Sequence, residues 1–240
     1  MNPLDKYYRE KLYPLQDGVI KIVNGLKLPF YLTGGTALSR YYLNHRYSDD
    51  LDFFVNGDPE FKSYLKSFIE YFRIPPPEIQ FKIHTERINI TDNYAQFFLY
   101  LDEIELKIDF VNDIATRFDS VVIDNRLGKV DSIKNILSNK ISALYRFEIK
   151  DYADIWCIAK NYKFNWRQLI NEAKQKEASV DPIEIINLFE SFPFKNLDII
   201  KWIKPVDYTQ VKNDFHIIAK DILNGQDNSL SGKIGKEQSE

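Results

Sequence analysis

The segment that decides the fold covers residues 31–54 and reads YLTGGTALSRYYLNHRYSDDLDFF. An apolar run over residues 28–32 predicts a short strand that ends at Gly34 and Gly35. The residues after the glycines predict a short helix that ends near Asn44. The glycines therefore lie at a strand-to-helix turn, where exposed amides at the positive end of a helix favour an anion such as a phosphate.

Three aspartates follow this turn within the same segment, and Asp49 alternates onto the opposite strand face from the other two. Asp50 and Asp52 are two positions apart in a stretch with β character, so both face one side of a strand while Leu51 and Phe53 face the other. Carboxylates that close repel each other unless a positive charge lies between them. We therefore expect a divalent cation here, Mg²⁺ or Mn²⁺, with one or two carboxylates and phosphate oxygens as its ligands.

A third carboxylate lies in a later strand-rich region, where the hydrophobic period changes to two. Leu106, Ile108 and Phe110 form one face of a predicted strand, and Asp109 lies on the opposite face, away from the apolar side. The predicted antiparallel strands of this region cover residues 79–84, 87–90, 95–101, 103–111 and 120–123. Asp109 is thus a candidate third ligand of the same cation.

The second half of the chain reads as almost entirely helical. Its predicted helices cover residues 132–146, 151–161, 166–176, 182–192 and 206–223, and Asn165 and Asp181 are the predicted N-caps of the third and fourth of them. A further helix over residues 4–24, with a kink or a break at Pro14, leads the chain. This change from β-rich to helical predicts an α+β protein with a first domain over residues 1–127, which carries the glycine turn and the carboxylates, and a helical bundle over 128–224. The polar residues 225–240 are predicted to be a disordered tail.

Composition narrows the class of protein. No run approaches the roughly 18 to 20 apolar residues of a membrane span, and the first five residues lack a signal-peptide pattern, so we expect a cytoplasmic protein without membrane contact. The single cysteine, Cys157, lies in an apolar helical context and is expected to be a buried, inert thiol. Net charge is −5 over residues 1–125 and +2 over 126–240, so the second half is the better candidate for contact with a polyanion.

The order of these motifs resembles nucleotidyltransferases of the polymerase-β type, which need a small-residue turn for phosphates and three carboxylates around metal ions. A closer resemblance, over roughly residues 15–165, is to the AbiEii/AbiGii toxins of type IV toxin–antitoxin and abortive-infection systems. The stretches that carry it are GGTAL at 34–38, HRYSDDLDF at 45–53, KIDF at 107–110, NKISAL at 139–144 and KDYADI at 150–155.

The resemblance implies a polymerase-β-type domain with a mixed sheet, followed by helices, that uses a nucleoside triphosphate and Mg²⁺. It implies functional roles for Ser48, Asp50, Lys140 and one of Asp151 and Asp154. Gly34, Gly35 and Thr36 would hold the β- and γ-phosphates, and Lys140 would offset charge on the triphosphate. The implied acceptor is RNA, at the 3′ end of a tRNA, and the implied partner is a winged-helix antitoxin.

Several of these residues also have ordinary structural explanations. Ser48 touches a phosphate or is a strand-entry serine, and Arg46 neutralises a triphosphate or is a surface-loop arginine. Lys140 reaches the triphosphate or snorkels to solvent from an apolar helix face. Asp151 is a functional carboxylate or a helix N-cap, and Asp154 is functional or an exposed helical residue.

Two other functions compete with transfer to RNA. One is transfer of a nucleotide to a small molecule such as an antibiotic, by an enzyme of the same superfamily. The other is a catalytically idle protein that binds or senses a nucleotide. The presence of all three acidic positions disfavours the idle protein, because a cluster of carboxylates without a cation destabilises the fold.

Overall fold

The computed structural model describes residues 2–73, 75 and 80–231, and it divides into two compact units. The first unit consists of residues 1–42 and 47–132, and the second consists of residues 43–46 and 133–240. The predicted boundary after residue 127 is therefore corrected to residue 132. Residues 128–130 form a strand of the first unit, because Val130 pairs with Leu32.

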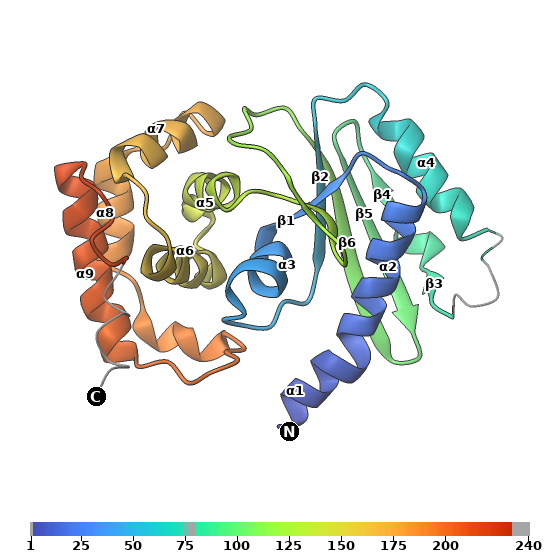
Figure 1. Ribbon diagram of the computed structural model, residues 1–240, viewed down its shortest axis with the longest axis horizontal. Coiled ribbons are helices and arrows are strands. Elements are labelled where there is room, and N and C mark those ends of the chain that lie inside the picture. The colour runs from blue at the N-terminus through green and yellow to red at the C-terminus, as the bar shows by residue number, and fades with distance from the viewer. Residues whose placement is uncertain (1, 74, 76–79, 232–240) are drawn as a thin grey trace. The chain divides into compact units, whose positions relative to one another are not determined.

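A mixed sheet forms the centre of the first unit (Figure 1). The described residues contribute eight strands in the order β3-β5-β6-β2-β1-β8-β7, with β4 paired to β5. The strands are β1 (Tyr31–Thr33), β2 (Leu51–Asn56), β3 (Lys82–Ile83), β4 (Asn89–Ile90), β5 (Tyr94–Leu101), β6 (Ile104–Asp113), β7 (Val122–Asp124) and β8 (Gly128–Val130). β2 pairs with β6 in parallel, whereas β1 pairs with β2 and β5 pairs with β6 in the antiparallel direction.

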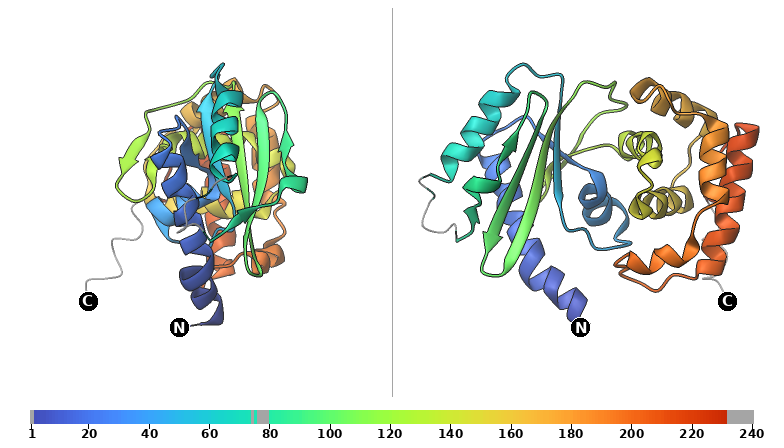
Figure 2. Two further views of the ribbon diagram at one scale, coloured as in Figure 1. Left: turned by 90° about the vertical axis from the view of Figure 1, so that its right-hand side faces the viewer. Right: turned by 180° about the vertical axis from the view of Figure 1, so that it is seen from behind.

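Helices cover one face of this sheet. α2 (Tyr13–Gly25) and α4 (Phe61–Tyr71) lie on the same side of the strands in both views (Figures 1 and 2). Phe68 of α4 packs against Phe97 and Phe110, with ring centroids 5.5 and 5.0 Å apart. Each fully buried side chain of this kind contributes roughly 1.5–3 kcal/mol of transfer free energy. The opposite residues on β5 and β6 are half-buried or exposed, as the period-two pattern predicted.

The first helical stretch differs from its prediction at Pro14. α1 (Pro3–Tyr7), a π-helical turn (Tyr8–Leu12) and α2 follow one another without a break. Pro14 directly follows the π-helical turn and the helix continues through it, so the predicted break is absent and the irregularity at the proline is limited to that turn.

The second unit is helical and matches its predicted elements closely. Its helices are α5 (Ile133–Ser142), α6 (Ile149–Asn161), α7 (Trp166–Lys176), α8 (Pro182–Glu190) and α9 (Tyr208–Asn224), and α8 lies beside α9 in both figures (Figures 1 and 2). Asn165 and Asp181 cap α7 and α8 through their side-chain oxygens, as their positions before these helices predicted. Gly225 ends α9 in the left-handed conformation.

The predicted disordered tail begins too early. Residues 225–231 pack on the helical unit, where the Asn228 amide donates to the carbonyls of Ala159 and Tyr162 at 2.6 and 2.8 Å, and Leu230 is buried. A buried amide with two acceptors stabilises this segment although its composition is polar. The remainder of the predicted tail, residues 232–240, lies outside the described residues. None of the described helices is long and apolar enough to span a membrane.

Candidate active site

The glycine turn connects β1 directly to α3 (Gly34–Ala37), and a π-helical segment continues it to Leu43. Gly34 has a φ of +64°, a backbone conformation that side chains with a Cβ rarely adopt. A Cβ on Gly34 would also collide with the carboxylate of Asp52. The turn therefore requires glycine for two reasons, and it places the backbone of residue 34 against one of the predicted metal ligands.

Strand register brings the second and third carboxylates together. Asp52 on β2 pairs with Asp109 on β6 across the parallel ladder, and with Thr33 on β1 across the antiparallel one. In-register neighbours have their side chains on the same face of the sheet. The prediction that Asp109 lies with Asp52 on the non-apolar face is therefore confirmed in geometry, although the cation itself stays a prediction.

Asp50 and Ser48 lie in the segment before β2, because the strand begins at Leu51. The strand therefore begins too late for Ser48 and Asp50 to share one of its faces. Instead, the Thr36 hydroxyl bonds to the Ser48 hydroxyl at 2.8 Å and donates to the carbonyl of Asp50. The buried amide of Gln16 donates to the carbonyls of Ser48 and Asp49 at 3.0 and 3.1 Å.

These bonds fix the backbone that presents Asp50, whose side chain is 40% exposed. Thr36 and Ser48 are themselves buried, at 0% and 7% exposure. Their role as phosphate contacts stays a prediction, while the bonds in the structure hold the turn and the acidic segment together. Gln16 was not predicted, since nothing in a helical apolar pattern marks one glutamine as a partner of a distant loop.

Lys107 lies on this face beside Asp109, and sequence analysis assigned it no role. Its ammonium group lies 2.9 Å from Asp109 and 3.5 Å from Asp50. Burial lowers the pKa of Lys107, but the hydrogen bond to Asp109 and the charges of Asp50 and Asp109 outweigh burial and raise that pKa above its ordinary value. The ammonium is therefore charged at neutral pH, and it partly neutralises the carboxylates that we expected a metal ion to neutralise.

The other oxygen of Asp109 also has partners. It accepts hydrogen bonds from the Tyr94 hydroxyl at 3.0 Å and from the Gln96 amide at 3.1 Å. Burial and the charge of Asp109 raise the pKa of Tyr94 to about 12, so its phenol is protonated at neutral pH and donates. Three donors thus fix the orientation of the Asp109 carboxylate, whose side chain is 14% exposed.

This donor set fits a small divalent cation that has few protein ligands. Among the described residues, no group of three or more histidine, cysteine or acidic side chains is placed to hold a metal ion, so Asp50, Asp52 and Asp109 do not form a closed cage. Mg²⁺ usually takes one or two carboxylates and completes its shell with water and substrate phosphates, so a cage is not required. The in-register pair Asp52 and Asp109, with the half-exposed Asp50 beside Lys107, supplies ligands of this type.

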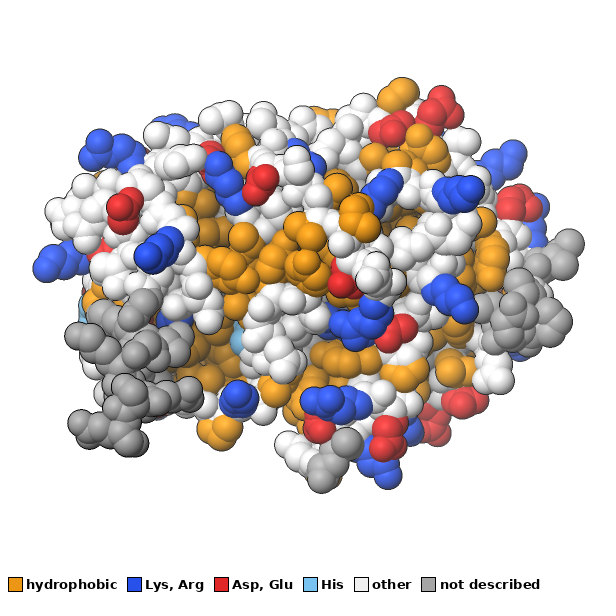
Figure 3. All heavy atoms as spheres, in the orientation of Figure 1, with side chains coloured by type: hydrophobic (Ala, Val, Ile, Leu, Met, Phe, Trp, Pro, Cys, Tyr) orange, Lys and Arg blue, Asp and Glu red, His pale blue; other side chains and the backbone are white. Residues whose placement is uncertain are grey.

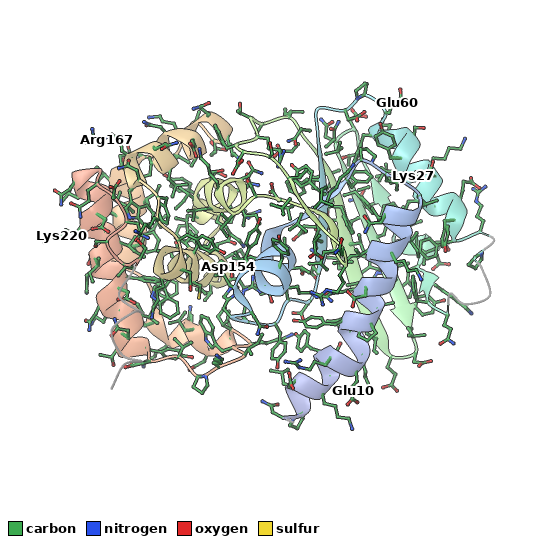
Figure 4. All side chains as sticks on the ribbon, in the orientation of Figure 1. Glu10, Lys27, Glu60, Asp154, Arg167 and Lys220 are labelled. Carbon is green, nitrogen blue, oxygen red and sulfur yellow. The ribbon has the colours of Figure 1, made fainter. Side chains whose placement is uncertain are left out.

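The other predicted residues form a buried ion cluster inside the helical unit. The Arg46 guanidinium binds both oxygens of Asp154, at 2.7 and 2.8 Å, and the His45 ring lies 2.8 Å from the same carboxylate. Lys140 of α5 bridges Asp151 and Asp154 at 2.6 and 2.7 Å. Figure 4 labels Asp154 on α6, and it labels Arg167 and Lys220 at the outer surface of the same unit.

Ionisation states in this cluster follow from pairing. Burial alone would raise the pKa of Asp154, but Arg46 and Lys140 hold it well below its ordinary value. Burial lowers the pKa of Lys140, and the charges of Asp154 and Asp151 outweigh that effect and raise it. Burial lowers the pKa of His45 despite its bond to Asp154, so His45 is neutral at neutral pH. Arg46 and Lys140 thus offset the charges of Asp151 and Asp154 beside a neutral ring, and the exposed Arg146 lies 3.4 Å from Asp151.

Four of the ordinary explanations are thereby wrong. Arg46 is 3% exposed and is no surface-loop residue, because its guanidinium is paired inside the unit. Asp154 is fully buried rather than exposed, and Asp151 lies inside α6, whose N-cap position is Glu148. Lys140 ends in the cluster and does not snorkel to solvent. Contact of these residues with a nucleotide stays a prediction.

Cys157 is 8% exposed, and burial raises the pKa of its thiol, as expected for an inert cysteine. A cavity of about 250 Å³ in the helical unit has an apolar floor that includes Leu137 and Ile158. None of the predicted site residues lines this cavity. It therefore adds nothing to the candidate site.

A family model described as the nucleotidyl transferase AbiEii toxin of type IV toxin–antitoxin systems matches residues 22–227. An uncharacterized protein of Aquifex aeolicus (strain VF5) is 28% identical over 225 residues, which is 93% of this chain and 99% of that protein. Its description does not state an activity.

Solved structures share the fold. JHP933 from Helicobacter pylori superposes with a TM-score of 0.58 at 22% identity, over 89% of this chain and 90% of the other. MenT4, a nucleotidyltransferase toxin of Mycobacterium tuberculosis H37Rv, superposes with a TM-score of 0.57 at 14% identity, over 88% and 83%. The predicted α+β fold, with a mixed sheet followed by helices, is therefore confirmed.

Proposed function

Because the chain belongs to the AbiEii family of nucleotidyl transferase toxins, we propose that it transfers a nucleoside monophosphate from a nucleoside triphosphate to RNA with the help of a divalent cation. Membership of this family establishes that the protein is a nucleotidyltransferase of a toxin–antitoxin system, and it confirms the resemblance that the motifs showed. Cation, acceptor and site residues are the proposed part. A winged-helix antitoxin encoded by a neighbouring gene is the proposed protein partner.

The observation that carries the proposal is the placement of three carboxylates around one glycine turn. Asp52 lies in register with Asp109 and against Gly34, and Asp50 precedes Asp52 by two residues. Three carboxylates this close together do not stabilise the sheet by themselves, because like charges repel each other. A cation and the triphosphate that accompanies it provide a reason for the arrangement.

Asp50, Asp52 and Asp109 would hold the Mg²⁺ or Mn²⁺, which would offset the negative charge of the triphosphate and of the leaving pyrophosphate. The amides of Gly34 and Gly35 would face the phosphates, since glycine leaves the backbone open to an anion. Asp109, oriented by Tyr94 and Gln96, would accept a hydrogen bond from the acceptor hydroxyl.

The nucleotide contacts proposed for Ser48, Thr36, Arg46, Lys140, Asp151 and Asp154 rest on the family resemblance. Thr36 and Ser48 hold the segment that presents Asp50. The other four bind one another within the helical unit. Substitution in either group is expected to act through folding as well as through the nucleotide, so Asp50 is the better position for a test.

An RNA acceptor is supported by half-exposed aromatic side chains on the same sheet face as Asp109. Phe98 pairs with Lys107 and Tyr100 pairs with Glu105 across β5 and β6. The Arg87 guanidinium lies 3.7 Å from the centre of the Phe98 ring, and the His84 ring lies 4.2 Å from that of Tyr100. Unpaired bases stack on such aromatic and guanidinium surfaces, at roughly 1–3 kcal/mol per base.

The test is incubation of the purified protein with total tRNA, Mg²⁺ and each α-labelled triphosphate in turn. We expect one or more triphosphates to label the tRNA, and periodate oxidation of the RNA 3′ end to prevent labelling. EDTA should abolish the reaction. Asp50→Asn should abolish it too, with the melting temperature within about 2 °C of wild type, because a half-exposed carboxylate contributes little to stability.

Asp92→Asn is the matched control, since Asp92 is 89% exposed in a surface ion pair and should leave labelling unchanged. Labelling of a hydroxylated antibiotic but not of RNA would replace the RNA acceptor by a small molecule. Binding of triphosphate without transfer to either acceptor would support the nucleotide-sensing alternative. A large loss of thermal stability in Asp50→Asn would assign Asp50 a structural role.

A further inference from the structure

The ammonium group of Lys107 lies beside Asp50 and Asp109, where we proposed that a divalent cation binds. Residues 107 and 109 are two apart on β6, so strand alternation puts both side chains on the same face. The pairing of Leu51 with Ile108 places Lys107 near the residue that precedes β2, which is Asp50. The resulting distances to Asp109 and Asp50 are 2.9 and 3.5 Å.

The electrostatic consequence is that the acidic face has a counter-ion of its own. One ammonium lies beside three carboxylates, so the local charge is reduced but stays negative. The side chains of Lys107 and Asp109 are 31% and 14% exposed, and charges so shielded from water interact more strongly than charges on an open surface. This pairing offsets repulsion that would otherwise destabilise the protein without a metal ion.

A metal ion and the ammonium group need the same oxygen atoms. Asp109 has two oxygens, of which Oδ1 accepts from Tyr94 and Gln96 and Oδ2 accepts from Lys107. Coordination through Oδ2 would place the metal ion within a few ångströms of the ammonium, and two positive charges that close repel each other. A cation that also drew on Asp50 would remove the second partner of Lys107.

We propose that Lys107 is a built-in counter-ion that competes with the divalent cation for Asp50 and Asp109, so that metal binding and release of Lys107 are linked. This inference rests on the proposed metal site and adds a regulation of that site. The lysine stabilises the acidic face before substrate arrives and weakens binding of a metal ion alone. A triphosphate that brings its own cation supplies phosphate oxygens as a new partner for the released ammonium.

The test measures Mn²⁺ binding by calorimetry and melting temperature with and without Mn²⁺, both in the absence of nucleotide. In Lys107→Gln the competitor is gone, so we expect Mn²⁺ to bind at least about threefold more tightly than to wild type. The variant should melt at a lower temperature than wild type without metal, and Mn²⁺ should raise its melting temperature more than that of wild type.

Two variants serve as controls. Lys107→Arg keeps the charge and should bind Mn²⁺ with an affinity closer to wild type than to Lys107→Gln. Lys62→Gln removes a lysine whose ion pair with Asp92 is exposed, and it should change neither affinity nor the effect of Mn²⁺ on melting. Equal or weaker Mn²⁺ binding by Lys107→Gln, with binding by wild type, would overturn the competition and leave the proposed function intact.

Absence of Mn²⁺ binding by wild type and Lys107→Gln, with and without a non-hydrolysable triphosphate analogue, would instead overturn the metal site of the proposed function and the competition with it. The two failures are therefore distinguishable. Loss of binding in the double variant that carries Asp50→Asn and Lys107→Gln would confirm that the measured cation occupies this face and not another acidic surface.

Discussion

At the scale of single residues, Gly34 has the narrowest requirement in the candidate site. Its backbone is left-handed, and the space where its Cβ would be is occupied by the Asp52 carboxylate. A side chain would therefore strain the turn and displace a proposed metal ligand at once. The first effect acts on stability and the second on activity, so a substitution can separate them.

Gly34→Ala should lower the free energy of unfolding by about 1–2 kcal/mol, the cost of a left-handed conformation for a residue with a Cβ. Nucleotide transfer should fall by much more than the fraction of unfolded protein explains, because Asp52 must rotate away. Urea unfolding and a transfer assay on the same preparation measure the two effects.

Gly25→Ala is the control, since Gly25 ends α2 and a Cβ there would have no atom within 4 Å. We expect this variant to be as active as wild type and at least as stable, since alanine restricts the unfolded chain. Full activity of Gly34→Ala would show that the position of Asp52 against the turn is irrelevant to transfer.

At the scale of elements, the short segment 43–46 matters more than its length suggests. It belongs to the helical unit, where Arg46 forms an isolated bridge with Trp202 and the His45 carbonyl accepts from Ile203 at 3.1 Å. Its side chains meet α6 at Asp154 and join Lys140 of α5 there. Removal of one partner from a buried pair of this kind costs roughly 3–5 kcal/mol.

His45 makes the stability of this cluster depend on pH. Its Nδ1 atom is buried and has no hydrogen-bond partner among the described residues, while Nε2 donates to Asp154. Burial lowers the pKa of His45 below its ordinary value of 6.5, so the unfolded chain takes up a proton that the folded protein refuses. Stability is therefore complete above pH 6.5 and falls as the pH is lowered below that value.

We expect the free energy of unfolding to fall between pH 7.5 and 5 with a contribution from His45 of at most about 1.4 kcal/mol per pH unit. His45→Gln should remove that contribution from the slope. His216→Gln is the control, since the His216 side chain is 50% exposed and lies in the same unit. Urea titrations at several pH values measure the slopes, and an unchanged slope in His45→Gln would contradict the assignment.

Below the range of His45, the pH dependence passes to Asp154. Its pKa is well below 3.8 because Arg46 and Lys140 stabilise the charged form against burial. A carboxylate with a depressed pKa contributes stability that is present above about pH 4 and is lost as the pH falls toward the folded pKa. Protonation of either group as the pH falls therefore lowers the stability of the helical unit.

At the scale of the whole molecule, positive charge is not concentrated in one field, so we expect RNA to be bound through individual lysines and arginines. The net charge is −3, and the face in Figure 3 shows blue and red side chains interspersed without a continuous field of Lys and Arg. The first half carries the carboxylates and the second half carries the positive balance. We therefore expect a moderate number of phosphate contacts, made by exposed lysines of the second half.

RNA binding should weaken with salt, with log K falling by roughly 0.7 per phosphate contact for each unit of log salt concentration. Lys150→Glu should weaken binding and reduce this slope, because Lys150 is exposed on the positive half. Lys66→Glu is the control. Lys66 is an exposed residue of α4 in the acidic half, so this variant should leave the slope unchanged. Fluorescence anisotropy with labelled tRNA measures both. Equal slopes for wild type and Lys150→Glu would remove this surface from the RNA path.

Lys140 is unsuitable for such a charge reversal. Its ammonium lies between Asp151 and Asp154, and a carboxylate there would place three negative charges in a buried cluster. Loss of labelling in that variant would report unfolding rather than a missing contact with RNA.

The sequence by itself determined the elements that local rules control. Period-two alternation over residues 95–111 predicted β5, β6 and the face that carries Asp109, because neighbouring side chains of a strand point to opposite sides. Caps at Asn165 and Asp181 predicted the start of α7 and α8, because an N-cap acts within three residues. The paired glycines and the acidic motif likewise indicated the candidate site, because both are local patterns of a few residues.

Only the tertiary structure decided which of these elements are neighbours. Parallel pairing of β2 with β6 puts Asp52 beside Asp109, and the same register places Lys107 beside Asp50. Residues 43–46 pack with the helical unit, so Arg46 binds Asp154, which is 108 positions away in the sequence. Such contacts depend on the register of distant strands and the packing of distant helices, which no local propensity or period encodes. The carboxylates, and the strand face that Lys107 shares with Asp109, could therefore be found from the sequence, whereas the contact of Lys107 with Asp50 could not.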